Sequence, residues 1–249
     1  MEAYRASPNE QARVANLFDM IPPQGERALD VGTRDGFLAM RLAARYREVV
    51  ALDLEMPRIE HPRIHPVKGN AARLAFPNRS FDVVLCAEVL EHVPPKMLPA
   101  VCREIARVSR GTIIIGVPYR QDLRIGKTTC AVCGKSNPPW GHVNSFDESR
   151  LQSLFRDCEI EAISFVGATR EKTNAISAAL LDFAGNPFGT WAQDEDCVHC
   201  GGKIGAPRPR NLSQRLATRI AMVAEDVQAR FTPVRAIWIH VRFRSEEAG

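Results

Sequence analysis

Short apolar runs alternate with amphipathic segments along most of the chain, which is the pattern of an α/β fold. The apolar runs predict buried strands at about 27–31, 49–53, 81–86, 112–119 and 159–166, with a short strand beginning at His65. Apolar residues at three- and four-residue spacing predict helices at about 8–19, 37–46, 96–109 and 146–157.

Ser145 followed by Glu148 is the expected cap of the fourth of these helices. A final strand at about 236–242 has a two-residue period, which predicts one buried face. Its apolar positions are Ile237, Ile239, Val241 and Phe243, and the positions between them are Trp238, His240 and Arg242.

The first strand ends in a glycine-bearing turn that leads into a helix, Asp30-Val31-Gly32-Thr33-Arg34-Asp35-Gly36. Gly32 allows a tight turn without a Cβ penalty, and Gly36 lets the helix begin close to a ligand. The second strand ends in Asp53, an acid placed to accept both hydroxyls of a ribose. Together these features predict a nucleotide-binding site, although such a string alone also occurs in plain strand-to-helix turns.

The fourth strand leads into Phe81-Asp82-Val83-Val84-Leu85-Cys86-Ala87-Glu88-Val89-Leu90-Glu91-His92-Val93. This succession resembles the class I S-adenosylmethionine-dependent methyltransferases, whose fourth strand reads F-D-x-V-x-x-x-x-V-L-E-H-V, over about residues 10–165. The resemblance implies a Rossmann-like sheet of seven strands, S-adenosylmethionine as cofactor, and methyl transfer. The cofactor contacts that it implies are Asp30, Gly32, Thr33, Arg34, Gly36, Asp53, Leu54, Asn70, Ala71, Ala87 and Glu88.

Two positions depart from the family pattern. Arg34 stands at the middle glycine of D-x-G-x-G-x-G, and Asn70 replaces the acid before Ala71. Asn70 keeps a carbonyl that can accept from the adenine amino group, and Arg34 could lie outward or meet the cofactor carboxylate. A non-catalytic binding module with a degenerate cofactor site therefore remains an alternative.

Composition adds little to this interpretation. The 249 residues are 45% hydrophobic and carry a formal charge of +4, which permits a large domain with an appendage and suits an anionic partner without requiring one. No apolar run approaches the length of a membrane span, and the first twenty residues lack a signal-peptide core, so we expect a cytoplasmic protein. The sequence does not indicate an oligomeric state.

Seven cysteines in such a protein argue against a disulfide framework. Cys86, Cys102 and Cys158 lie among apolar neighbours and are expected in the core, the last two on helical faces. The other four form two knuckles, Cys130-Ala131-Val132-Cys133-Gly134-Lys135 and Cys197-Val198-His199-Cys200-Gly201-Gly202-Lys203. Two such loops predict one structural zinc site with four thiolates. The alternatives are a redox pair, an iron–sulfur cluster, two unrelated cysteine pairs, or a metal site in which His199 or His142 replaces one cysteine ligand.

The knuckles lie in two interruptions of the α/β pattern. We therefore expect a core of residues 1–120, 145–167 and 233–249, and a zinc-clipped cap formed by insertions at 121–144 and 168–232. The second insertion contains an apolar helix at about 175–184 and an amphipathic helix at about 212–231. The apolar stripe of the latter is expected to pack on the protein body, with a membrane-surface helix or a substrate lid as alternatives.

Methyl transfer to oxygen or nitrogen needs in-line approach and often a base. His142 is the preferred base, because it lies in a Gly-His-Val segment that the resemblance places on the substrate side, with His92 and Glu88 as further candidates. The resemblance implies, as acceptor, a hydroxyl of a small molecule, sugar or lipid-linked intermediate. RNA methylation is a second hypothesis, with Lys135, Arg208 and Arg210 on phosphate, but few basic or stacking residues accompany the knuckles.

Overall fold

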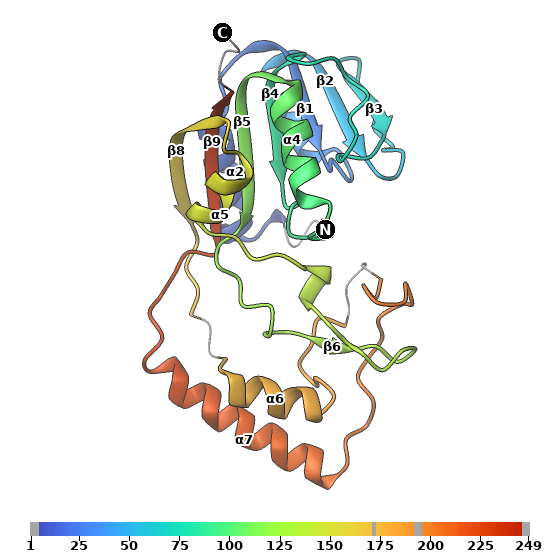
Figure 1. Ribbon diagram of the computed structural model, residues 1–249, viewed down its shortest axis with the longest axis vertical. Coiled ribbons are helices and arrows are strands. Elements are labelled where there is room, and N and C mark those ends of the chain that lie inside the picture. The colour runs from blue at the N-terminus through green and yellow to red at the C-terminus, as the bar shows by residue number, and fades with distance from the viewer. Residues whose placement is uncertain (1–4, 171–172, 192–195, 246–249) are drawn as a thin grey trace. The chain divides into compact units, whose positions relative to one another are not determined.

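The computed structural model describes residues 5–170, 173–191 and 196–245 (Figure 1). The chain forms two compact units. The core unit comprises Met1–Tyr119, Phe146–Gly167 and Ala236–Gly249, and the inserted unit comprises Arg120–Ser145 and Ala168–Arg235. Each unit is described by itself below.

The core unit is built on a seven-stranded sheet, as the sequence predicts, with the order β3-β2-β1-β4-β5-β9-β8 (Figure 1). Strands β1 to β5 are parallel, and β9 is antiparallel to both β5 and β8. The strand order reverses between β1 and β4, so the carboxyl ends of these strands flank a topological switch point, where open α/β sheets bind ligands. The strands are β1 Gly25–Val31, β2 Tyr46–Asp53, β3 Ile64–Lys68, β4 Phe81–Ala87, β5 Ser109–Pro118, β8 Cys158–Val166 and β9 Trp238–Ser245.

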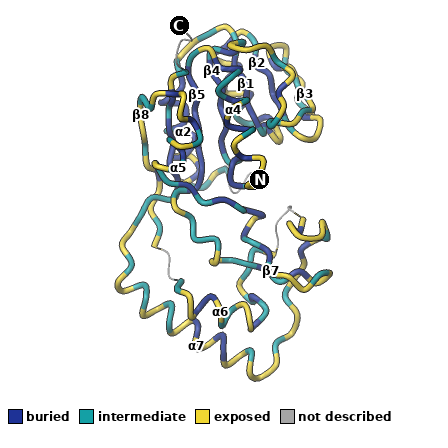
Figure 2. The backbone as a smooth tube through the Cα atoms, viewed as in Figure 1, coloured by how far each residue is buried: buried dark blue, intermediate teal, exposed yellow. Residues whose placement is uncertain are grey.

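Helices cover both faces of this sheet, which buries its central strands (Figure 2). Helices α2 (Pro8–Met20) and α3 (Phe37–Leu42) pack on one face, and α4 (Leu98–Val108) and α5 (Glu148–Leu154) pack on the other. Burial of both faces explains why these strands read as continuous apolar runs in the sequence.

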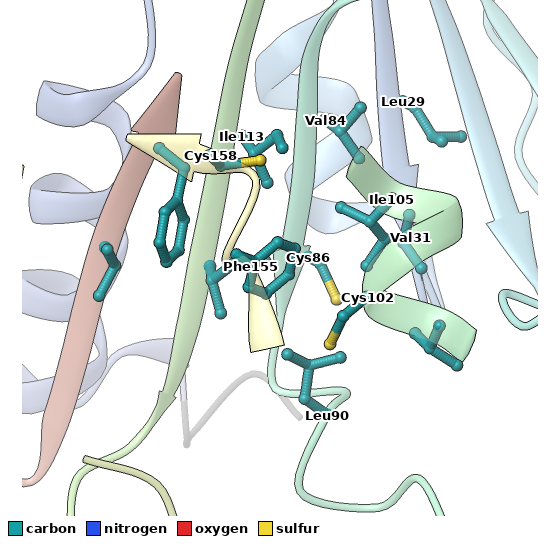
Figure 3. Packing of buried hydrophobic residues seen from close by; sticks show 14 of the residues in the cluster. Leu29, Val31, Val84, Cys86, Leu90, Cys102, Ile105, Ile113, Phe155 and Cys158 are labelled. Atoms are coloured by element: carbon teal, nitrogen blue, oxygen red, sulfur yellow. The ribbon is translucent and has the colours of Figure 1, made fainter. Parts of the chain in front are cut away.

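The three cysteines expected in the core are buried there. Cys86 lies on β4 and Cys102 on α4, close to Leu90 (Figure 3). Burial raises the pKa of Cys102 to about 12, so its thiol is not reactive at neutral pH. Cys158 was expected on a helical face, but it opens β8, because α5 already ends at Leu154.

Three further expectations need correction. The helix predicted at 37–46 ends at Leu42, since Tyr46 pairs with Gly25 and begins β2. The cap of α5 is Asp147, which accepts from the Arg150 amide at 2.9 Å, and not Ser145. Strand β9 is buried on both faces, because α2 covers the face that carries Trp238 and His240.

The inserted unit contains a two-stranded ladder of β6 (Thr128–Thr129) and β7 (Ser136–Asn137), the short helix η1 (Pro139–Gly141), and helices α6 (Ala175–Phe183) and α7 (Leu212–Ala229). Helices α6 and α7 form an antiparallel pair. Asn174 donates to the Ala224 carbonyl at one end of the pair, and Gln214 donates to the Phe183 carbonyl at the other. Asp182 on α6 bonds Lys127 and Ser136, which joins this pair to the β6–β7 ladder.

The apolar stripe of α7, which was expected to be covered, does not pack within the inserted unit. The residues of α7 that are buried are small, Ala217, Thr218 and Ala221. The large apolar side chains are exposed, including Leu212 at 82% and Val223 at 63%. None of the helices in the described ranges is long and apolar enough to cross a membrane.

Candidate active site and cysteine cluster

The turn after β1 has the backbone shape that the sequence predicts. Gly32 and Gly36 have φ values of 74° and 81°, in the left-handed region that favours glycine. A Cβ on Gly32 would lie 2.3 Å from Val89 Cγ2, so no other residue fits there without displacement. Arg34 also lies in this region, with φ of 53°, at the position where the family pattern has glycine. The turn therefore keeps a glycine-like backbone at Arg34.

Asp30 is held below this turn. Its carboxylate is buried and accepts from Thr33 Oγ1 at 2.7 Å. Burial raises the pKa of Asp30 to about 6, although the bonds from Thr33 and from the Ala39 backbone act in the opposite direction. Thr33 thus orients Asp30, and the side chain of Asp30 faces the start of α3 and not open solvent.

Asp53 lies at the end of β2 beside the same turn. Its Oδ2 accepts from the backbone N–H of Arg34 at 2.8 Å, which joins the ends of β1 and β2. The neighbouring Leu54 is 66% exposed. An open hollow borders these residues and is lined by Arg34, Asp35, Asp53, Glu55, Met56, Pro57 and Arg58. The structure therefore brings Asp53 and the turn together at one hollow of the core unit.

Asn70 follows β3 in a local turn. Its Oδ1 accepts from the Ala72 backbone N–H at 2.8 Å, and the Arg73 N–H donates to the Asn70 carbonyl. One lone pair of the side-chain oxygen is thereby used, and the amide nitrogen remains as a donor. Ala71, between them, is partly buried.

Glu88 directly follows β4, next to the buried Ala87, and adopts φ of 58°. Its Oε2 accepts from Trp238 Nε1 at 3.3 Å, while its Oε1 is buried and has no partner within the described ranges. Burial raises the pKa of Glu88, and the charge of Arg13 opposes this shift. A non-glycine residue in the left-handed region beside a ligand edge is a typical feature of functional sites.

Glu91 is fully buried, and neither of its carboxyl oxygens has a hydrogen-bond partner among the residues that the structure describes. Burial, followed by the charge of Glu88, raises the pKa of Glu91 well above its usual value. His92, the next residue, is partly buried, and its amide closes a turn on the Val89 carbonyl. The core unit therefore presents two carboxyls that resist ionisation within one short segment.

The side chain of Arg13, on helix α2, places a positive charge beside this segment. Arg13 forms two 2.7 Å bonds with Glu10 in a buried pair, and its guanidinium lies 5.9 Å from the centre of the Trp238 ring. One guanidinium thus faces the carboxyls of Glu10, Glu88 and Glu91, which disfavours ionisation of all three at once.

Sequence reasoning missed Glu10, Arg13, Glu91 and Trp238 as members of the site. A charged pair at a three-residue spacing on an otherwise apolar helix face is the signal that could have indicated Glu10 and Arg13.

His142 lies in the inserted unit. Its Nδ1 is 2.6 Å from Gln121 Oε1, and the ring lies 5.9 Å from that of Trp140. An amide oxygen accepts only, so Nδ1 carries the proton and Nε2 is the basic nitrogen. This tautomer suits a general base. Glu88 and His92 belong to the core unit, and the role of His142 towards the cofactor stays a prediction.

The four knuckle cysteines come together in the inserted unit. The sulfur atoms of Cys130 and Cys200 are 3.8 Å apart, as are those of Cys133 and Cys197, and all four lie within 4.8 Å of one another. Four sulfurs at about 2.3 Å from a central zinc ion would be about 3.8 Å apart in a tetrahedron. The side chains present therefore fit a four-thiolate metal site, and neither His142 nor His199 joins this set among the described residues.

The two knuckles share one backbone pattern. Gly134 N–H donates to the Cys130 carbonyl and Gly201 N–H to the Cys197 carbonyl, and both glycines have φ near 70°. Backbone N–H groups of Cys133 and Val132 face the Cys130 sulfur and lower its pKa to about 6. The Gly202 N–H acts in the same direction on Cys200, but desolvation of its sulfur and the three neighbouring sulfurs raise its pKa to about 12. A central cation would stabilise all four thiolates together and so lower the pKa of Cys200 as well.

Comparisons with known proteins agree with this geometry. A family model described as a methyltransferase domain matches residues 29–115. A probable S-adenosylmethionine-dependent methyltransferase of Mycobacterium tuberculosis is 29% identical over 146 residues, covering 56% of this chain and 50% of that protein. A ubiquinone biosynthesis O-methyltransferase of Hahella chejuensis is 35% identical over 94 residues, covering 33% of this chain and 40% of the relative.

Solved structures share the fold. A Bacillus halodurans protein, provisionally described as a methyltransferase, superimposes with a TM-score of 0.60 at 14% identity, covering 94% of this chain and 99% of that chain. The chain spans half or less of the length of the curated relatives it matches first.

Proposed function

We propose that the chain transfers the methyl group of S-adenosylmethionine to an acceptor at the carboxyl edge of the core sheet. The match of residues 29–115 to a methyltransferase domain and the similarity to a probable S-adenosylmethionine-dependent methyltransferase support this proposal. One observation carries this proposal. The glycine turn, Asp53 and Glu88 lie at the ends of the adjacent strands β1, β2 and β4, and β1 and β4 flank the topological switch point.

In this proposal each strand end binds one part of the cofactor. The carboxylate of Asp53 accepts from the ribose hydroxyls, and Leu54 packs on the adenine. The amide of Asn70 and the backbone of Ala71 contact the adenine edge. The turn that contains Gly32, Thr33, Arg34 and Gly36, supported by Asp30, faces the methionine part, with Ala87 and Glu88 beside it.

The acceptor that we propose is a hydroxyl group of a small molecule, a sugar or a lipid-linked intermediate. The O-methyltransferase of ubiquinone biosynthesis among the relatives supports this acceptor class. In the transfer, the acceptor oxygen forms a bond to the methyl carbon while the bond from that carbon to sulfur breaks, and a base takes the hydroxyl proton. Candidate bases are His142 through Nε2, Glu88 through its unpartnered Oε1, and His92.

We further propose that the four cysteines hold one structural zinc ion. Their mutual sulfur distances support a tetrahedral site. Four thiolates leave no open coordination position, so the ion would stabilise the inserted unit and would not contact the substrate.

Calorimetry with S-adenosylmethionine and its demethylated product tests the cofactor proposal. We expect the wild type to bind both, and Asp53→Ala to weaken binding at least tenfold because the ribose loses its acceptor. Glu55→Ala is the matched control, since Glu55 lines the same hollow but its side chain is exposed and pairs with Lys68. No binding by the wild type, or equal binding by Asp53→Ala, would reject the proposal.

A further inference from the structure

Helix α7 carries a long apolar stripe that is open to solvent. Its side chains recur at three- and four-residue spacings, and each is about half exposed or more. Figure 2 shows exposed and intermediate residues over most of the helix. The members of this stripe, named the α7 stripe below, are Leu212, Leu216, Ile220, Val223 and Val227 on the helix and Phe231 just after its end.

The α7 stripe is not needed to hold α7 in the inserted unit. The contacts of α7 with α6 use the opposite face, through the small residues Ala217 and Ala221, and polar bonds fix both ends of the pair. Helix α6 adds Ile176 and Phe183, which are 69% and 59% exposed, to the apolar surface of this pair. An exposed apolar stripe of this length usually marks an interaction surface.

Positive charge accompanies the α7 stripe. Residues 205–224 contain four arginines, Arg208, Arg210, Arg215 and Arg219, and no acidic residue. At 100° per residue, Arg215 and Arg219 lie along one edge of the α7 stripe and away from the buried alanines. Of the two acids later in the helix, Glu225 accepts from Thr173, and Asp226 lies along the same edge as Arg215 and Arg219, toward the C-terminal end of α7.

We propose that the α7 stripe docks on the surface of an anionic lipid bilayer, with α7 lying in the plane of the interface. The apolar side chains would enter the boundary between head groups and acyl chains, and the arginines along the edge would contact lipid phosphates. Charge complementarity favours this occupant over a second copy of the chain. The anionic head groups would neutralise Arg215 and Arg219, whereas the α7 stripe of a second copy is edged by the same two arginines.

Co-sedimentation of the full chain with lipid vesicles tests the proposal. We expect the wild type to pellet with vesicles of phosphatidylcholine and phosphatidylglycerol and to bind vesicles of phosphatidylcholine alone at least tenfold more weakly. Added salt should reduce binding to the anionic vesicles. The double variant Ile220→Gln/Val223→Gln should lose at least tenfold in binding without any change in charge. Met222→Gln is the matched control, because Met222 lies on the same helix and is 47% exposed but lies off the α7 stripe.

Arg215→Gln/Arg219→Gln should weaken binding to anionic vesicles alone. Circular dichroism and cofactor calorimetry on each variant check that both units remain folded. Bilayer binding does not depend on the cofactor site, so a negative result in the vesicle experiment would leave the proposed methyl transfer unaffected. Absence of wild-type binding to anionic vesicles at low salt would overturn the proposal. So would equal binding by the Ile220/Val223 variant, or a wild-type dimer in light scattering that this variant abolishes, which would assign the α7 stripe to a second copy.

Discussion

The indole N–H of Trp238 donates to Oε2 of Glu88 at 3.3 Å, which links the start of the last strand to the segment that follows β4. This bond stabilises the ionised carboxylate and opposes the effect of burial, which raises the pKa of Glu88. The relationship joins two residues that are far apart in the sequence, and it makes the charge of Glu88 depend on β9.

Trp238→Phe should therefore destabilise the protein more at pH 8 than at pH 5. The ionised carboxylate of Glu88 is the form that loses most when its donor is removed, and a larger fraction of Glu88 is ionised at the higher pH. Urea unfolding at both pH values measures the difference. We expect it to be about 1 kcal/mol, because a hydrogen bond to a charged group contributes about 1.5–3 kcal/mol and one to a neutral group about 1 kcal/mol. The double variant Glu88→Gln/Trp238→Phe serves as control, because it contains no carboxylate at this position. An equal pH dependence in both variants would contradict the assignment.

The buried carboxyl of Asp30 predicts a stability that falls as the pH rises. Its pKa is raised from 3.8 to about 6, so between these values the folded state binds more protons than the unfolded state, and the free energy of unfolding decreases with pH. Asp30→Asn removes this cost and should flatten the pH dependence between pH 4 and 6, with a gain of up to about 3 kcal/mol at pH 7. The gain is reduced by the weaker bond that an amide makes with Thr33.

Thermal unfolding across this pH range checks the prediction, with Asp19→Asn as control, since Asp19 is exposed on α2 and is not among the charges that shift the pKa of Asp30. The same Asp30→Asn variant should bind the cofactor more weakly, because Asp30 supports the glycine turn. A variant that is less stable than the wild type at pH 7 would show that the bonds of Asp30 outweigh its burial.

Most of the core sheet could be predicted from the sequence, because strands buried on both faces leave continuous apolar runs. The end of α3 could not, since Ala43 and Ala44 are good helix formers and only the pairing of Tyr46 with Gly25 begins β2 there. The covering of β9 likewise depends on α2, more than two hundred residues earlier, through the bond between His240 and Asn16. Such tertiary contacts override local periodicity.

The residues of the candidate site likewise fall into those that the sequence could predict and those that it could not. The glycines and Asp53 were visible because turn geometry and ligand chemistry restrict the residue types at those positions. Arg13 and Trp238 were not, because their relevance depends on where α2 and β9 meet Glu88. The stripe of α7 shows a further limit, since periodicity reveals an apolar face but not what covers it.

Arg34 distinguishes an active cofactor site from a degenerate one. Its backbone has φ of 53°, so Arg34→Gly should relieve strain of about 1 kcal/mol and raise the melting temperature. If the side chain only lines the hollow, Arg34→Gly should bind S-adenosylmethionine about as well as the wild type. Arg34→Ala is the matched control, because it removes the side chain but keeps the strain. Binding by the glycine variant alone would favour a non-catalytic binding module over an enzyme.

The cysteine cluster gives the prediction most open to refutation. Since the sulfurs of Cys130, Cys133, Cys197 and Cys200 lie within 4.8 Å of one another, a single ion would fasten together the two insertions. The apolar core around them is small, formed by Cys130, Cys197 and Ile204 with Cys133 packed against it, so metal binding would supply much of the local stability. We expect about one zinc ion per purified chain, measured by atomic emission.

Cys200→Ser should lower the zinc content and make residues 121–144 as well as 186–210 sensitive to protease, because loss of one thiolate loosens both knuckles. Cofactor affinity should fall only modestly, since Asp30, Gly32, Asp53 and Asn70 belong to the core unit. His199→Ala, next to Cys200 but outside the sulfur cluster, should keep both the zinc and the protection. Iron and sulfide in place of zinc would assign a cluster, and unchanged protection of 121–144 in Cys200→Ser would show that the two knuckles do not share an ion.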